Sequence, residues 1–123
     1  MGSGAGFFEK GIFNYKQEDS HCGVKLLIRL DNGHKNCPMY SHSSKMYAHR
    51  DTEKKVTQIA VYENRVRVYD IDWGHDHDSF KKGEIHIQYY KDGHRDKSRP
   101  AEKPTPEQVQ LVKEICRRWN NEE

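Results

Sequence analysis

The sequence lacks long apolar runs and contains little cysteine and little net charge. No stretch approaches the ~18 consecutive apolar residues of a membrane-spanning helix, so no membrane span is expected. No basic segment followed by an apolar one is found, so no signal peptide is expected either. The cysteines Cys22, Cys37 and Cys116 are odd in number, which excludes a complete disulfide framework. A formal net charge of +2 argues against a strongly cationic, nucleic-acid-binding coat.

The size and polarity of the chain predict one domain with a thin core. The chain has 123 residues, of which 33% are charged, and its mean hydropathy is −1.12. Seven tyrosines and two tryptophans compensate, because aromatic side chains bury a large area per residue. We expect a flexible N-terminal segment at 1–10 and a single α+β domain at 11–123.

Alternating apolar and polar residues predict an antiparallel sheet at about 24–90. The runs 58–62 and 65–69 form a predicted hairpin with Glu63-Asn64 as its turn. Pairing residue 61 with residue 66 places Arg65, Arg67 and Tyr69 on one face of that hairpin. A third strand at 84–90 presents a polar face that consists of Glu84, His86 and Gln88, and a short helix is expected around 43–49.

A helix at 105–119 completes the predicted fold. Thr105 is its expected N-cap, Pro106 fits the first helical position, and Gln108 completes a capping box. A stiff connector at 96–104 precedes it. Because its apolar residues recur at helical spacing, the helix should cover one face of the small twisted sheet. The other face is predicted to be polar and open.

The polar face gathers residue types that suit acid–base chemistry on phosphates. If strand 84–90 lies beside the hairpin, Glu84 and His86 meet Arg65, Arg67 and Tyr69. Guanidinium groups bind phosphates in bidentate fashion, and a histidine beside a carboxylate exchanges protons near neutral pH. These groups could serve a metal-independent ribonuclease. The alternative is a solvated sheet face with cross-strand charge pairs.

The loop before that strand carries a second cluster, with Asp72, His75 and His77. Three interpretations stay open for it. The two histidines could hold a metal with Asp72 or His86, could transfer protons or orient a substrate, or could belong to a solvated loop.

Two further clusters have weaker patterns. His21-Cys22 and His34-x-x-Cys37 resemble the halves of a zinc site, although the spacing of each half is irregular. Reduced cysteines beside strands would need no ligand role. A basic strip after the third strand could follow a nucleic-acid backbone or be a solvated linker, and it consists of Arg95, Lys97, Arg99 and Lys103.

One stretch of the chain, roughly 65–106, resembles a known group of proteins. The segments Trp73-Gly74-His75-Asp76-His77, 83–89 and Asp92-Gly93-His94-Arg95, followed by a proline-rich connector, are similar to C-terminal toxin domains of bacterial polymorphic toxins. Ribosome-cleaving colicins are similar in theme. The extra His77 departs from that pattern, and so does Glu84-x-His86, because many relatives have Pro-His-x-His at that place. These departures leave open which imidazole is the base.

The resemblance implies a metal-independent endoribonuclease without a cofactor, acting on RNA in the cytoplasm of a target cell and held in check by an immunity protein. It points to His75, His77 and His86 as catalytic, with Asp72 or Glu84 as the carboxylate partner. The residues themselves suggest Arg65, Arg67, Tyr69 and Arg95 for binding substrate. The alternative is a non-enzymatic module that binds protein or nucleic acid and could be stabilised by zinc.

Overall fold

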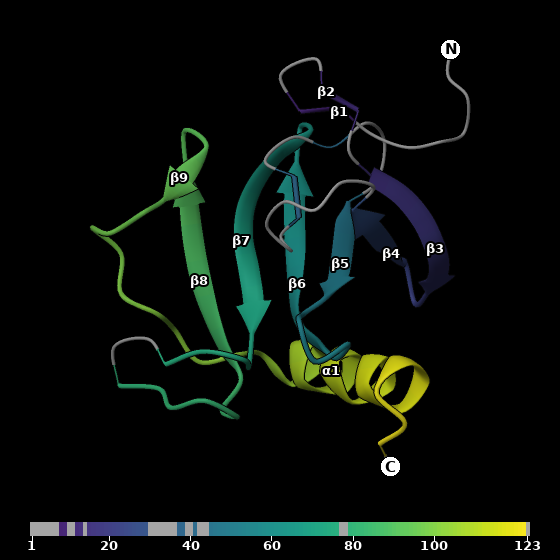
Figure 1. Ribbon diagram of the computed structural model, residues 1–123. Helices are drawn as coiled ribbons and strands as arrows, with labels where there is room; N and C mark the ends of the chain where they lie inside the picture. Colours follow the sequence, from purple (N-terminus) through teal and green to yellow (C-terminus); the bar gives the residue numbers. More distant parts are fainter. Residues whose placement is uncertain are drawn as a thin grey trace.

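The structure, a computed structural model, describes residues 8–9, 12–13, 15–29, 37–38, 41, 45–76 and 79–122. A seven-stranded sheet dominates it, and one helix packs against the sheet (Figure 1). The elements are β1 (Phe8–Glu9), β2 (Ile12–Phe13), β3 (Tyr15–His21), β4 (Val24–Arg29), β5 (Met46–Arg50), β6 (Val56–Glu63), β7 (Val66–Asp72), β8 (His86–Lys91), β9 (His94–Arg95) and α1 (Pro106–Trp119).

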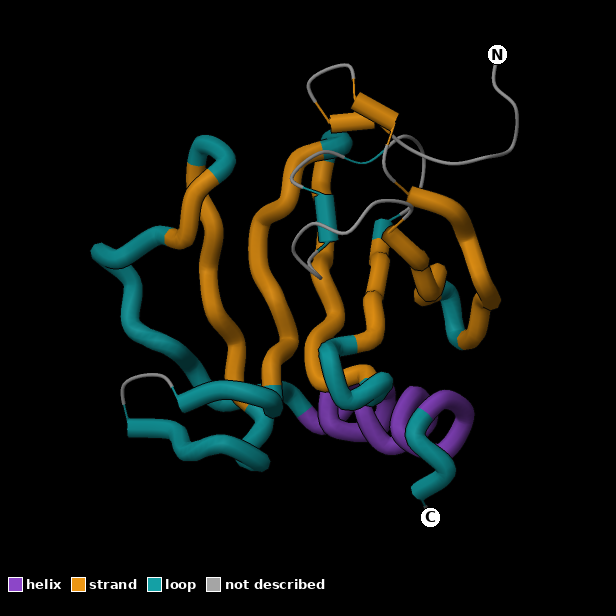
Figure 2. Tube along the Cα trace, viewed as in Figure 1, coloured by secondary structure: helices purple, strands orange, loops and turns teal. Residues whose placement is uncertain are grey.

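The strands lie in chain order from β3 to β9, while β1 and β2 form a separate pair. Every neighbouring pair in the large sheet is antiparallel except β4 and β5, which are parallel. Figure 2 shows these strands side by side, with α1 across one end of the sheet. The predicted α+β class is therefore confirmed, and the sheet extends beyond the predicted range 24–90 at both ends.

Helix α1 and its capping are as predicted. The Thr105 side chain accepts a hydrogen bond from the Gln108 backbone N–H at 3.2 Å, and the Gln108 side chain accepts one from the Thr105 N–H at 2.8 Å. No helix in the described part of the chain is long and apolar enough to cross a membrane. The apolar core lies between α1 and one sheet face, and its buried members are Val24, Leu26, Ala48, Val56, Ile59, Ile71, Ile87, Val112, Ile115, Cys116 and Trp119.

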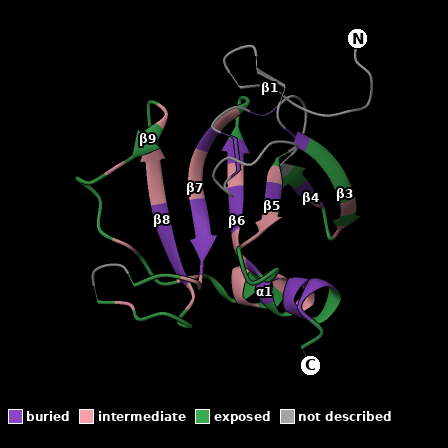
Figure 3. Ribbon diagram, in the orientation of Figure 1, coloured by how far each residue is buried: buried purple, intermediate pink, exposed green. Residues whose placement is uncertain are grey.

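The opposite face is polar, as predicted, but its centre is buried rather than open. In Figure 3 the lower halves of β7 and β8 are coloured as buried. A small apolar cluster beside it contains Tyr15, Leu27, Cys37, Tyr47, Ala60 and Tyr62. The buried polar residues of β7 and β8 are Arg67, Asp70, Asp72, His86 and Gln88.

Two local predictions are wrong. The hairpin turn is Asn64-Arg65, with φ of +50° and +69°, which is the left-handed pair that a two-residue hairpin turn of type I′ requires. Tyr62 pairs with Arg67 and Val61 with Tyr69, so residue 68 is an extra residue that forms a bulge. Arg67 and Tyr69 therefore point to opposite faces.

The expected helix at 43–49 is also wrong, because β5 occupies 46–50.

Candidate functional site

A row of polar side chains crosses the buried part of the polar face. Gln58 of β6 pairs with Asp72 of β7, and Asp72 pairs with His86 of β8. His49 of β5 extends the row, since it lies where the β5–β6 register shifts, between the pairs formed by residues 48 and 50. The row thus draws one residue from each of four neighbouring strands.

Asp72 is the centre of this row. Its side chain is 1% exposed and accepts hydrogen bonds from the Gly74 N–H at 2.8 Å and from Gln58 Nε2 at 3.2 Å. The Nδ1 atom of His75 lies 3.2 Å from Asp72 Oδ2. Because a carboxylate only accepts, this contact requires the proton on His75 Nδ1, which leaves Nε2 as the atom with a lone pair. The His75 side chain itself is 63% exposed.

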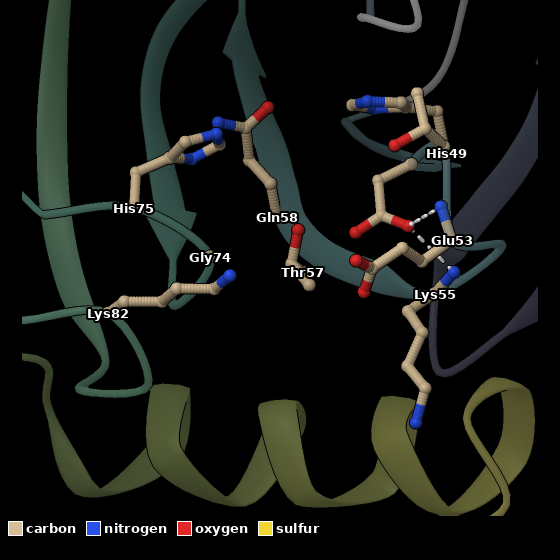
Figure 4. A pocket seen from close by; sticks show the side chains of 10 residues that line it. His49, Glu53, Lys55, Thr57, Gln58, Gly74, His75 and Lys82 are labelled. Carbon is tan, nitrogen blue, oxygen red and sulfur yellow. Dashed lines mark hydrogen bonds between the residues drawn. The ribbon is translucent and has the colours of Figure 1, made fainter.

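His75 opens onto a cleft of about 670 Å³ between the β5–β6 turn and the loop that joins β7 to β8. Figure 4 shows His75 and His49 on opposite sides of this cleft, with Gln58 between them and the Lys82 ammonium group reaching toward Thr57. The cleft also carries acidic groups. Its lining consists of His49, Asp51, Thr52, Glu53, Lys55, Thr57, Gln58, Gly74, His75 and Lys82.

The β7–β8 loop is fixed against the first residues of β6. The Trp73 N–H donates to the Thr57 carbonyl at 2.9 Å, and the Gly83 N–H donates to the Trp73 carbonyl at 2.9 Å. A Cβ atom at position 74 would lie 2.5 Å from Thr57 Oγ1, so only glycine fits between them. This close contact places the next residue, His75, over Asp72.

A buried ion pair lies next to the row. Arg67 donates to both carboxylate oxygens of Asp70, at 2.8 Å each, and its guanidinium lies 4.4 Å from the centre of the Tyr90 ring. Residues three apart in a regular strand point to opposite faces, and the bulge at residue 68 brings this pair onto one face.

The charge and burial of this pair perturb the groups around it. Burial opposes the charge of Arg67, but attraction and hydrogen bonding to Asp70 outweigh burial and raise the pKa of Arg67. Burial and the nearby Asp70 charge raise the pKa of Tyr90 to about 12. Arg67 therefore stays charged and engaged within the protein.

The structure separates the predicted catalytic residues. Asp72 and His75 come together, whereas His77 lies outside the described residues. His86 is 0% exposed, stacks on Phe80 with ring centres 5.3 Å apart, and donates from Nδ1 to the Glu84 carbonyl at 2.9 Å. The Glu84 carboxylate instead accepts from the Lys81 N–H at 2.8 Å. His86 is thus a core residue beneath the site, and its expected pairing with the Glu84 carboxylate is not found.

The predicted substrate-binding residues do not line the cleft. Arg67 is 1% exposed and engaged by Asp70. Tyr69 packs on the helix-covered face, where Gln108 Nε2 lies 3.5 Å from its hydroxyl. Arg65 and Arg95 are exposed, but the β6–β7 turn and β9 lie at the opposite end of the strands (Figure 1).

The residues of the two predicted halves of a zinc site lie beside different neighbours. The His21 ring contacts Trp119 with centres 6.4 Å apart, and Cys22 is exposed in the β3–β4 turn. Cys37 Sγ lies 3.5 Å from His49 Nδ1, and His34 lies outside the described residues. Within the described ranges, no group of three or more His, Cys, Asp or Glu side chains is placed to hold a metal.

Most residues that line the cleft were not predicted from sequence, among them His49, Lys55, Gln58 and Lys82. The alternation of Met46 and Ala48 with Tyr47 and His49 is a strand signal that could have placed His49 on the polar face. The two lysines are in turns, where sequence gives no indication of what they face.

Comparison with protein-family models, with curated proteins and with solved structures finds no match for this chain. The function must therefore be argued from the site itself.

Proposed function

We propose that this domain is a ribonuclease that cleaves RNA by imidazole acid–base chemistry in the cleft between His75 and His49. One observation carries the proposal: an exposed imidazole, His75, is held by a buried carboxylate at the edge of a cleft that a second imidazole faces. A pair of imidazoles at neutral pH supplies both a proton acceptor and a proton donor.

The proposed roles follow from the contacts. Nε2 of His75 takes the proton of a ribose 2′-hydroxyl, while Asp72 holds Nδ1–H and stabilises the imidazolium that forms. The 2′-oxygen attacks the neighbouring phosphorus, and protonated His49 donates its proton to the departing 5′-oxygen. The products are a 2′,3′-cyclic phosphate and a free 5′-hydroxyl. Lys82 lines the same cleft, and its ammonium group, which reaches toward Thr57 (Figure 4), offsets the charge that develops on the phosphate.

This proposal changes the catalytic set expected from sequence. His75 and Asp72 are kept, His49 takes the place of His86 as the second imidazole, and Lys82 replaces the predicted arginines. The 2′-hydroxyl is the internal nucleophile, so RNA is a substrate and DNA is not. The resemblance to polymorphic-toxin domains supports the proposal. By the same resemblance we propose that an inhibitor protein is its partner and that the domain is delivered to a target cell's cytoplasm.

The test is cleavage of total RNA by purified protein, with a chelator present, between pH 5 and 8. Removing either imidazole by His75→Ala or His49→Ala should lower the rate by ~100-fold or more, the usual contribution of a general acid or base. His94→Ala is the matched control, because His94 is exposed on β9 at the far end of the sheet and should keep its full rate. Absence of cleavage by the wild-type protein would refute the proposal, and RNA binding without cleavage would identify the cleft as a binding site.

A further inference from the structure

We propose that Gln58 and Arg67 are positioning residues that fix Asp72, and through it the tautomer of His75. The four side chains form a continuous series of contacts from the buried ion pair to the exposed imidazole. The inference deepens the proposed function and rests on it for its kinetic readout, while its structural readout is independent of any activity.

The series begins at a guanidinium that cannot easily move. Arg67 donates to Asp70 through Nε and one terminal nitrogen, at 2.8 Å each, and through the other terminal nitrogen to the Cys37 carbonyl at 3.0 Å. Its side chain is 0% exposed. A bidentate pair of this kind fixes orientation as well as charge.

Gln58 contacts both Arg67 and Asp72, and so links the orientation of the guanidinium to that of the Asp72 carboxylate. Its Oε1 accepts from Arg67 at 3.2 Å, and its Nε2 donates to Asp72 Oδ2 at 3.2 Å. A guanidinium has no acceptor and a carboxylate has no donor, so only one orientation of the amide satisfies both neighbours. Arg67 therefore determines which end of the Gln58 amide faces Asp72.

Asp72 is held on both oxygens as a result. The Gly74 N–H contacts Oδ1, and Gln58 contacts Oδ2, which is also the closer oxygen to His75 Nδ1. Because Asp70 balances Arg67, the charge of Asp72 is available to His75. Loss of the Gln58 donor would let the carboxylate turn, and His75 would no longer be restricted to the Nδ1–H form.

Other titratable groups adjoin His75 in the chain or line the same cleft, and they are kept unchanged in the test. Asp76 follows it in the chain, and the cleft presents five further titratable groups from the β5–β6 turn, β5 and the loop. These are His49, Asp51, Glu53, Lys55 and Lys82.

The test replaces Gln58 by leucine, which has no polar atoms, and by asparagine, which keeps the amide but is too short to reach both neighbours. Gln110→Leu is the matched control, since Gln110 is exposed on α1 and contacts Glu114. We expect kcat for RNA to fall by about 10- to 100-fold with KM nearly constant, because small misplacements of catalytic groups cost up to ~100-fold. Long-range ¹H–¹⁵N NMR of neutral His75 should show Nδ1–H in the wild type and a mixture of tautomers in both Gln58 variants.

The inference is overturned if folded Gln58→Leu or Gln58→Asn keeps the wild-type kcat and tautomer. A change equal to that of Gln110→Leu would overturn it as well. If the wild-type protein cleaves no RNA, the proposed function fails, but the tautomer comparison still decides the positioning role. If the leucine variant does not fold, the asparagine variant, which keeps the polar side chain, provides the same readouts.

Discussion

Replacing Gly74 with alanine should damage the candidate site more than it damages the fold. The new Cβ would lie 2.5 Å from Thr57 Oγ1 and 2.7 Å from Thr57 Cβ, both far inside van der Waals contact. The loop must therefore move away from β6. Forced repacking of this kind costs ~1–3 kcal/mol of unfolding free energy. A displacement of His75 of ~1 Å would cost up to ~100-fold in rate.

Urea unfolding and RNA cleavage measure the two effects separately. The control is a second substitution that makes room for the new methyl group. Thr57→Ala removes Oγ1 but keeps the Cβ atom at 2.7 Å, so it should restore the Gly74→Ala protein only in part. Thr57→Gly removes both atoms and should restore the position of His75 more fully. Wild-type stability in Gly74→Ala, or no difference between the two double variants, would refute the steric explanation.

Two further predictions concern acid stability and thiol reactivity. Hydrogen bonds from Trp119, the Ser20 N–H and Arg118 lower the pKa of Asp19 from 3.8 to about 2, so its stabilising effect is complete above about pH 4 and is lost as pH falls toward 2. Asp19→Asn should therefore flatten the fall in unfolding free energy over that interval, and an unchanged acid limb would contradict this. Cys22 is exposed, whereas Cys37 and Cys116 are 2% and 8% exposed and burial raises the pKa of the Cys116 thiol. A thiol reagent should rapidly modify one cysteine in the folded protein and three in denaturant, and rapid modification of a second would contradict the buried placement.

Much of the fold could be predicted because its signals are local. The cap at Thr105 and the period of the helical residues depend on neighbours within a few positions, and both predictions are confirmed. The polar face predicted for strand 84–90 also left Ile87 and Tyr89 on the other face of β8, where they pack in the core. The parallel pairing of β4 with β5 depends on residues far apart in the chain, and no local pattern announces it.

The site was harder to predict because one extra residue changes which side chains share a face. Simple alternation places Arg67 on the same sheet face as Tyr69 and on the face opposite Asp70. The bulge at residue 68 reverses both relations. In sequence, a buried arginine that pairs with a nearby carboxylate cannot be distinguished from an exposed arginine that could bind a phosphate. Only the register of β6 and β7 distinguishes the two.

The row that crosses four strands has a consequence for the timing of activity during synthesis. His49 is made early, whereas Asp72, His75 and the helix that buries the other sheet face are made later. A nascent chain on the ribosome therefore has one imidazole but not its partner, and the sheet lacks the cover of α1. If the cleft cleaves RNA, the ribosome that makes this protein is not exposed to it until nearly the whole domain has emerged.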